Sequence, residues 1–137
     1  MSQPQGISTK TNKPYKVIIA ENSTFQARMI RQIFESEGYE IVGIAENGKK
    51  LLDMYKTNKK TDIIAMEINL PLMDGYAAFW EIKDLGPLPR VVFVTEENTP
   101  AIMRSLIDNG AADYVVKPFK REKLLEKTHN AILKIHG

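Results

Sequence analysis

Short runs of apolar, mostly β-branched residues alternate along the chain with longer stretches in which apolar residues recur at helical spacing. The short runs are too brief for helices, and most are continuously apolar, as in strands that are buried on both faces of a parallel sheet. This pattern predicts five strands, at residues 16–20, 40–44, 62–66, 90–94 and 113–116.

The longer stretches have the periodicity of amphipathic helices, with apolar residues on one face. In the first, this face is formed by Phe25, Met29, Ile30, Ile33 and Phe34, and Gly38 is placed to end the helix. Further helices are predicted at about 48–57, from the N-cap Asp74 onward, from Pro100 to Gly110 and at about 121–135. Their inward positions are expected to be Leu51, Leu52, Tyr55, Phe79, Ile82, Leu124, Leu125, Thr128, Ile132 and Ile135.

Strands that alternate with helices form βα units with right-handed crossovers, which build a parallel sheet covered on both faces. A chain of 137 residues supports one core but is too short for a closed barrel, so the expected fold is a doubly wound (βα)5 α/β domain. Residues 1–14 carry no such pattern and are expected to be a disordered lead-in. Residues 15–137 are then expected to form a single domain, with no effector domain after it.

Composition removes several classes of protein. The chain has no cysteine, which excludes disulfides, a thiol nucleophile and cysteine-based metal sites. Its formal net charge of +2 gives no reason to expect binding to nucleic acid or to an anionic membrane. The apolar runs are too short to cross a bilayer, and residues 1–14 do not resemble a secretory signal. We therefore expect a cytoplasmic protein without membrane insertion.

Polar side chains follow four of the five predicted strands. Functional groups in doubly wound sheets gather beyond the carboxyl ends of the strands, and these junctions bring carboxylates, an amide, a hydroxyl and an ammonium to one edge. This set suits a small cation together with a phosphoryl group better than it suits ordinary solvated loops. The junctions are Glu21-Asn22-Ser23, residues 67–71, Thr95-Glu96 and Lys117-Pro118-Phe119.

The spacing of these segments resembles the receiver domain of two-component response regulators, the CheY-like family, over about residues 16–135. The matching segments are residues 17–23, 62–75, 92–95 and 110–119. The resemblance implies a flavodoxin-like sheet with strand order 2-1-3-4-5. It also implies a signalling protein as partner: a histidine kinase, an effector or a chemotaxis component.

The resemblance further assigns roles to individual residues. Glu67 lies at the phosphoacceptor position, Lys117 at the phosphate-binding lysine and Thr95 at the switch hydroxyl. Tyr114 matches the aromatic residue that changes rotamer, and the peptide bond between Lys117 and Pro118 is expected to be cis. The family's magnesium ligands fall on Glu21, Asn22, Glu67 and the carbonyl of Asn69, and its partner face falls on Arg104, Asp108, Tyr114, Lys120 and Lys123.

Two positions depart from the family. Glu67 stands where the family has aspartate, and its extra methylene moves the carboxylate by roughly 1 Å, an error that can cost about 10²-fold in rate. Asn22 offers a neutral amide where the family has an acid, so any Mg²⁺ binding should be weak. We therefore expect a stand-alone atypical receiver that is not phosphorylated and is not an enzyme.

Two alternatives remain open. One is a working phosphoacceptor that uses Glu67 or a neighbouring acid. The other is a flavodoxin-like cofactor-binding domain, which would need a loop rich in Ser, Thr and Gly after the first strand, where this chain has Glu21.

Overall fold

Each predicted apolar run forms a strand, and each amphipathic stretch forms a helix, in the computed structural model, which describes residues 4–134. The strands are β1 (Lys16–Ala20), β2 (Glu40–Ala45), β3 (Ile63–Met66), β4 (Arg90–Thr95) and β5 (Asp113–Val116). The helices are α1 (Thr24–Ser36), α2 (Gly48–Thr57), α3 (Gly75–Leu85), α4 (Pro100–Asp108) and α5 (Arg121–Leu133). None of the helices within 4–134 is long and apolar enough to span a membrane.

The five strands form one parallel sheet in the order β2-β1-β3-β4-β5. This confirms the predicted fold. The chain runs from β1 outward to β2 and then returns to the other side of β1 to form β3. The direction of winding therefore reverses between β1 and β3, which is where open α/β sheets carry their functional groups.

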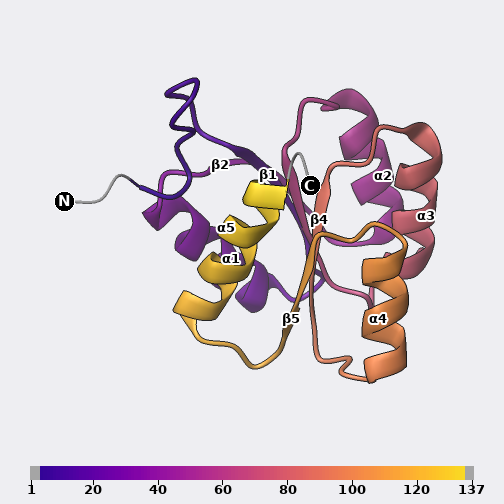
Figure 1. Ribbon diagram of the computed structural model, residues 1–137. Coiled ribbons are helices and arrows are strands. Elements are labelled where there is room, and N and C mark those ends of the chain that lie inside the picture. The colour runs from indigo at the N-terminus through magenta and orange to yellow at the C-terminus, as the bar shows by residue number, and fades with distance from the viewer. Residues whose placement is uncertain (1–3, 135–137) are drawn as a thin grey trace.

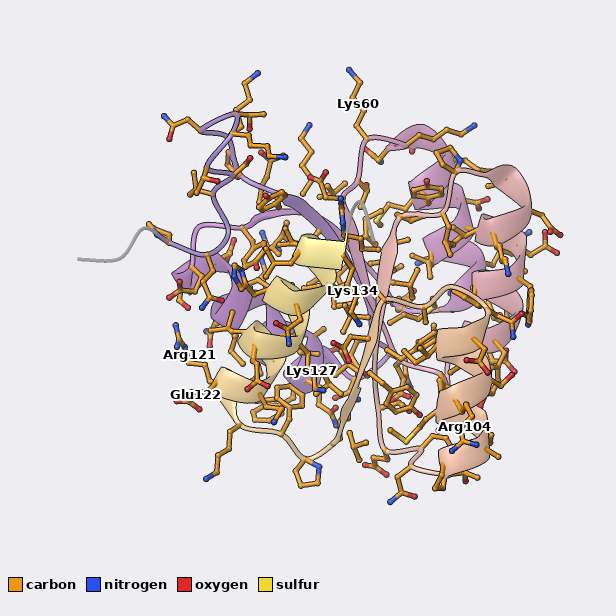
Figure 2. The ribbon with its side chains drawn as sticks, viewed as in Figure 1. Lys60, Arg104, Arg121, Glu122, Lys127 and Lys134 are labelled. Carbon is orange, nitrogen blue, oxygen red and sulfur yellow. The ribbon has the colours of Figure 1, made fainter. Side chains whose placement is uncertain are left out.

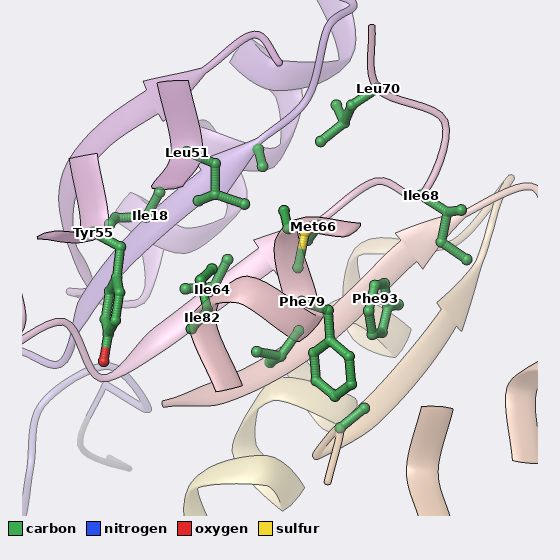
Figure 3. Packing of buried hydrophobic residues seen from close by; sticks show 14 of the residues in the cluster. Ile18, Leu51, Tyr55, Ile64, Met66, Ile68, Leu70, Phe79, Ile82 and Phe93 are labelled. Carbon is green, nitrogen blue, oxygen red and sulfur yellow. The ribbon is translucent and has the colours of Figure 1, made fainter. Parts of the chain in front are cut away.

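Helices cover both faces of the sheet, with α1 and α5 on one face and α2, α3 and α4 on the other (Figure 1). The two sides of the sheet belong to separate buried clusters. On the α2/α3 side, Phe79 and Phe93 pack edge to face with ring centroids 5.5 Å apart, as seen in the close view of Figure 3. Because β1 and β3 are buried along nearly their whole length, the backbone that positions the strand ends is firmly held.

Local signals in the sequence account for most of the helix ends. The side chains of Ser23, Asn47 and Asp74 accept hydrogen bonds from backbone amides at the starts of α1, α2 and α3. This confirms Asp74 as an N-cap. Gly38 and Gly110, which follow α1 and α4, have φ angles of 84° and 110°, a backbone region that glycine enters without steric cost.

Phe25 departs from its predicted position. Helical spacing placed it on the buried face of the first helix, but it is 78% exposed in the structure. Phe25 lies in the first turn of α1, just beyond the carboxyl end of β1, where the sheet offers no surface to pack against. Ile30 and Phe34, further along the same face, are buried as expected. Ile135, the last predicted inward position, lies outside the described residues.

The segment before β1 also departs from expectation, because it is ordered from residue 4 onward; residues 1–3 lie outside the described residues. Its hydrogen bonds run from Gly6 N to Glu37 O (2.7 Å) and from Tyr15 N to Gly6 O (2.7 Å), and Ile7 forms an antiparallel bridge with Pro14. We call residues 4–15 the N-terminal segment. Backbone hydrogen bonds hold this segment in place. Such bonds do not require a periodic pattern of apolar residues, so the sequence pattern does not predict them.

Candidate functional site

The carboxyl ends of the strands bring three charged residues together. The hydrogen-bond ladder of the sheet continues one residue past the strands, because Glu21 N donates to Ala45 O and Glu67 N donates to Ala20 O, both at 2.9 Å. Lys117 N donates to the carbonyl of Thr95 at 2.8 Å. The backbones of Glu21, Glu67 and Lys117 are therefore as firmly placed as the strands themselves.

The side chains of these three residues form a buried ion-pair cluster. Lys117 Nζ lies 2.5 Å from Glu21 Oε1 and 2.9 Å from Glu67 Oε1. The side chains of Glu21, Lys117 and Glu67 are 3%, 8% and 8% exposed. We refer to Glu21, Lys117 and Glu67 as the ion-pair cluster; it carries one ammonium between two carboxylates.

The second oxygen of each carboxylate is also bonded. Glu21 Oε2 accepts a hydrogen bond from Ser23 N at 2.8 Å. Glu67 Oε2 accepts hydrogen bonds from Ile68 N at 2.7 Å and from Asn69 N at 3.1 Å. Both carboxylates are thus held at both oxygens, which is the condition under which a charge is tolerated in a buried position.

The pKa values of Glu67 and Lys117 shift in the directions that favour their charged forms. Burial by itself would raise the pKa of the Glu67 carboxyl, but the Thr95 hydroxyl and the Lys117 ammonium, together with the Asn69 amide, bring it below its usual value. Burial would lower the pKa of Lys117, but its contacts with Glu21 and Glu67 raise it above its usual value. Both shifts have the sign expected of a mutually stabilised ion pair.

Thr95 and Tyr114 lie beside this cluster, and both are inside the protein. Thr95 is fully buried, and its Oγ1 accepts a hydrogen bond of 3.4 Å from Glu97 N. The Tyr114 hydroxyl donates a hydrogen bond of 2.6 Å to Glu97 O. Its ring lies next to Phe93, and burial is the main cause that raises its pKa. Glu97, in the turn after β4, therefore connects both residues through its backbone.

The expected metal ligands do not form a coordination shell in this arrangement. Glu21 and Glu67 are bonded to Lys117, whereas Asn22 and Asn69 are exposed. Between residues 4 and 134, no three Asp, Glu or His side chains are grouped as metal ligands. A Mg²⁺ ion would have to displace the lysine ammonium to reach both glutamates. The residues present therefore fit this ion poorly, since Mg²⁺ demands near-octahedral geometry and charged oxygen ligands.

The residues of the expected partner face are only partly brought together. Lys120 and Lys123 line a hollow of about 470 Å³ over β5 and α5, together with Tyr114. Arg104 and Asp108 are exposed on α4 but are not part of its lining. Tyr114 is only 6% exposed, so it offers little surface to a partner in this conformation.

Sequence reasoning missed the groups that fix the cluster and Tyr114. These groups are the carbonyl of Glu97 and the amides of Ser23 and Ile68. Every residue has such backbone atoms, so the sequence does not show which of them form these bonds. Phe25 was assigned to the core, yet it lines a hollow of about 300 Å³ with Met29 and Phe119 beside Lys117. Because position 25 holds a large apolar residue, the sequence does not indicate that this position is exposed.

The sheet order and the polar carboxyl edge define a class of protein, and the family comparison agrees. The model of the response regulator receiver domain matches residues 17–129. The chain therefore belongs to the receiver domain family. The cis peptide bond between Lys117 and Pro118, expected from the family resemblance, is also present.

Relatives place the chain more closely. It is similar to the chemotaxis protein CheY of Bacillus subtilis (strain 168), with 30% identity over 118 residues that cover 86% of this chain and 98% of that protein. The chemotaxis protein CheY of Treponema pallidum (strain Nichols) is 33% identical over 115 residues, covering 83% of this chain and 80% of that protein. The chain is the receiver domain of a CheY-like signalling protein.

Solved structures support the same placement. The CheX-CheY-BeF3-Mg+2 complex from Borrelia burgdorferi contains a chain that superposes with a TM-score of 0.92 at 30% identity. The match covers 96% of this chain and 98% of that chain, so it extends beyond the family segment into the N-terminal segment.

Proposed function

We propose that this chain is an atypical receiver that signals from the cytoplasm by binding another protein, without phosphorylation of an aspartate. The observation that carries the proposal is the ion-pair cluster itself, in which Glu67 stands at the phosphoacceptor position and pairs with Lys117 at 2.9 Å. The Lys117 ammonium, which would bind a transferred phosphoryl group, is already paired with two carboxylates.

Geometry argues against phosphoryl transfer to Glu67. In this reaction the protein contributes mainly position and electrostatics, since the nucleophile must attack in line with the leaving group. Glu67 Oε2 accepts hydrogen bonds from two backbone amides and Oε1 accepts one from Lys117, and these bonds fix the orientation of the carboxylate and reduce its nucleophilicity. The longer side chain also fills space that a transferred group would need.

The cluster supplies part of what a phosphorylated aspartate would supply. It places negative charge next to Lys117 and Thr95, and the Tyr114 hydroxyl is bonded inward to Glu97 O in the same state. A planar carboxylate has fewer oxygens and less charge than a phosphoryl group, so the mimicry is incomplete. We infer that Glu67 holds the pocket in one fixed state.

A protein partner is supported by a relative of known structure, because the Borrelia burgdorferi CheY was solved in complex with CheX. For this chain, we propose that the face comprising Arg104, Asp108, Lys120 and Lys123 contacts a signalling protein. Its exposed charges would set the orientation and rate of association more than the affinity. Signalling would then depend on the amount of protein or on competition for the partner.

The test is incubation with acetyl phosphate and Mg²⁺, followed by intact mass measurement. The unaltered protein should gain no phosphoryl mass, and the matched variant Asn22→Asp with Glu67→Asp, which restores the family's acids, should gain one group. A mass gain in the unaltered protein that disappears in Glu67→Gln would overturn the proposal in favour of a phosphorylated glutamate. A gain that persists in Glu67→Gln would assign the phosphoryl group to a neighbouring acid and overturn it equally.

Metal affinity provides an independent test. We expect Mg²⁺ to bind the unaltered protein in the millimolar range or more weakly, since Asn22 is neutral and both glutamates are paired. The double aspartate variant should bind more tightly. Tight binding of Mg²⁺ to the unaltered protein, measured by calorimetric titration, would contradict the proposal that the paired glutamates leave no good metal site.

The coupling to the partner face can be tested without the partner. Glu67→Gln leaves the shape of the side chain but removes its charge, so the Tyr114 ring should change its NMR chemical shifts if the pocket state is coupled to that face. Once a partner is identified, equal affinities for the unaltered protein, Glu67→Gln and Glu67→Ala would mean that the face works alone.

A further inference from the structure

One tetrapeptide occurs twice in the chain, each time just before a central strand. Lys-Thr-Asn-Lys forms residues 10–13 and again residues 56–59. The first copy leads into β1 and the second into β3, which are paired parallel neighbours. The register pairs Val17 with Ile63, and each copy precedes its paired residue by the same number of positions. The two copies therefore arrive at the same end of the sheet, opposite the ion-pair cluster.

The lysines of these two segments gather at that end. We call the six lysines of residues 10–16 and 56–60 the amino-edge lysines: Lys10, Lys13, Lys16, Lys56, Lys59 and Lys60. All are exposed except Lys16, which is half-buried. Figure 2 shows Lys60 projecting from the same end of the molecule as the loop of the N-terminal segment.

The N-terminal segment presents its lysines from an ordered turn. Ser8 Oγ accepts hydrogen bonds from Lys10 N at 3.2 Å and Thr11 N at 3.3 Å, and Ser8 N donates to Lys13 O at 2.9 Å. These bonds fix the backbone on both sides of the exposed side chains. A partner that contacts Lys10 and Lys13 therefore does not have to order a disordered tail, which lowers the entropic cost of binding.

Several other lysines of the protein have an acidic partner. Lys50 pairs with Glu46, Lys123 lies 3.7 Å from Glu126, and Lys127 lies 3.6 Å from Asp113. Within the part of the chain that the structure describes, none of the amino-edge lysines takes part in an ion pair. Unpaired like charges repel one another in the folded state.

A hollow lies within this surface. It has a volume of about 260 Å³ and is lined by Lys16 and Lys60, with Asn58 and Thr61 between the segments and Glu40 at the start of β2. Glu40 and Asp62 are the acids adjoining the lysines here, and Asp62 Oδ2 already accepts a hydrogen bond from Lys16 N at 2.8 Å. Over the whole surface, the six amino-edge lysines outnumber these two acids, so its charge is positive.

We propose that the amino-edge lysines form a docking surface for an acidic protein segment, with the hollow between Lys16 and Lys60 receiving one of its carboxylates. The surface carries the complementary charge, and a hollow of this size accommodates a single side chain. It lies at the opposite end of the sheet from the ion-pair cluster, so a docked segment would not contact the phosphoacceptor position.

The composition of the surface favours a protein over other polyanions. Single-stranded nucleic acid is usually held by aromatic stacking and arginine. The two segments contain no arginine, and their one aromatic residue, Tyr15, is half-buried. Stable attachment to a membrane uses exposed apolar side chains as anchors. The large apolar side chains that are exposed among residues 4–134 all lie outside the two segments and the hollow: Phe25, Leu72, Trp80, Leu85, Ile107 and Leu133.

The experiment measures binding of the full chain to a short fluorescent poly-glutamate peptide at low ionic strength. Two variants each reverse one block: Lys10→Glu with Lys13→Glu, and Lys56→Glu with Lys59→Glu. The matched control, Lys49→Glu with Lys50→Glu, makes the same change of net charge at the start of α2, near the opposite end of the sheet. Circular dichroism checks that each variant is folded.

We expect each block variant to weaken peptide binding about tenfold relative to the unaltered protein, and the control to change it by less than about twofold. Binding should also weaken as the ionic strength rises. Failure of the peptide to bind, or equal weakening by the control, would overturn the proposal. Tighter binding of an oligonucleotide or of phosphatidylserine vesicles than of the peptide would overturn the assigned partner class.

Discussion

The charged side chains at the two ends of the sheet differ in burial and in pairing. At the carboxyl end, the ion-pair cluster holds one lysine between two glutamates, and all three side chains are at most 8% exposed. At the amino end, six lysines gather, and two of them, Lys16 and Lys60, line a hollow together with Glu40. Loops gather at both ends of a parallel sheet. Buried charges there must form ion pairs or hydrogen bonds within the protein, whereas exposed charges remain available to a partner.

This difference has an energetic consequence. Buried charges are poorly screened, and removing one member of a group leaves the others without compensation. Exposed charges are screened by salt over about 10 Å at 0.1 M and contribute little individually. Substitutions at the carboxyl end should therefore have large effects that are insensitive to salt, and substitutions at the amino end should have small effects that salt abolishes.

The largest effect is expected from Lys117→Met. This change leaves two buried carboxylates facing each other, and breaking a buried ion pair by removing one partner costs about 3–5 kcal/mol. The measurement is urea denaturation at neutral pH. In the variant, the two acids should bind protons more readily when folded than when unfolded. Its stability should therefore increase on acidification from neutral pH towards pH 5, and a loss below about 1 kcal/mol would show that water already screens the cluster.

The next effect is expected from Glu67→Gln. The amide retains an acceptor for Ile68 N and Asn69 N, and Lys117 keeps Glu21 as its partner, so the cost should be about 1–3 kcal/mol. Thermal unfolding measures it at low and high salt. If the loss of stability disappears in high salt, the pair between Glu67 and Lys117 behaves like an exposed ion pair, and the two ends of the sheet do not differ in this respect.

At the amino end, Gly6→Ala tests whether the N-terminal segment is part of the fold. An added Cβ would lie 2.3 Å from Tyr39 N and 2.6 Å from Glu37 O, so the segment must move away. We expect a loss of about 1–2 kcal/mol, the range typical of overpacking, with faster hydrogen exchange at Tyr15 N. Gln5→Ala, at an exposed neighbouring position, is the control and should have little effect. Unchanged exchange in Gly6→Ala would mean that the segment is not held as described.

The pH dependence of stability reports on the ion-pair cluster, because the pKa values of Glu67 and Lys117 are shifted in the folded state. Because the folded pKa of Glu67 lies below its usual 4.5, its contribution is present above that pH and is lost as the pH falls through the folded value. Because the folded pKa of Lys117 lies above its usual 10.5, its contribution is present below that pH and is lost as the pH rises. The free energy of unfolding, measured by urea denaturation at a series of pH values, should therefore show a plateau between these limits. In Lys117→Met the plateau should be replaced by a slope.

Much of the fold could be predicted because its signals are local. Continuous apolar runs mark the strands, and Asp74 and Gly38 mark helix ends through hydrogen bonding and backbone conformation. Phe25 was misplaced because helical periodicity reports which side of the helix a residue lies on, not whether the sheet extends far enough to cover it. The N-terminal segment was missed because its contacts are backbone hydrogen bonds to Glu37, distant in sequence.

The site was predictable to a different degree. The junctions that contribute Glu21, Glu67 and Lys117 followed from the strand ends, because parallel topology brings them to one edge. Their mutual pairing depends on side-chain rotamers and on amides such as Ser23 N, which the sequence does not specify. The repeated tetrapeptide was visible in the sequence, but its meaning required the register of β1 with β3.

The smallest effect is expected from neutralising two of the amino-edge lysines, Lys13→Gln with Lys60→Gln. Both side chains are exposed and unpaired among the described residues, so their removal should relieve repulsion and stabilise the fold by about 0.3 kcal/mol at low ionic strength. Urea denaturation at low salt and at about 1 M salt, where screening acts over only about 3 Å, measures the gain and its loss. Lys50→Gln, which breaks the exposed pair with Glu46, should instead destabilise slightly at low salt. A loss of stability in the double variant would mean that acids already compensate these lysines, and the amino end would then resemble the carboxyl end.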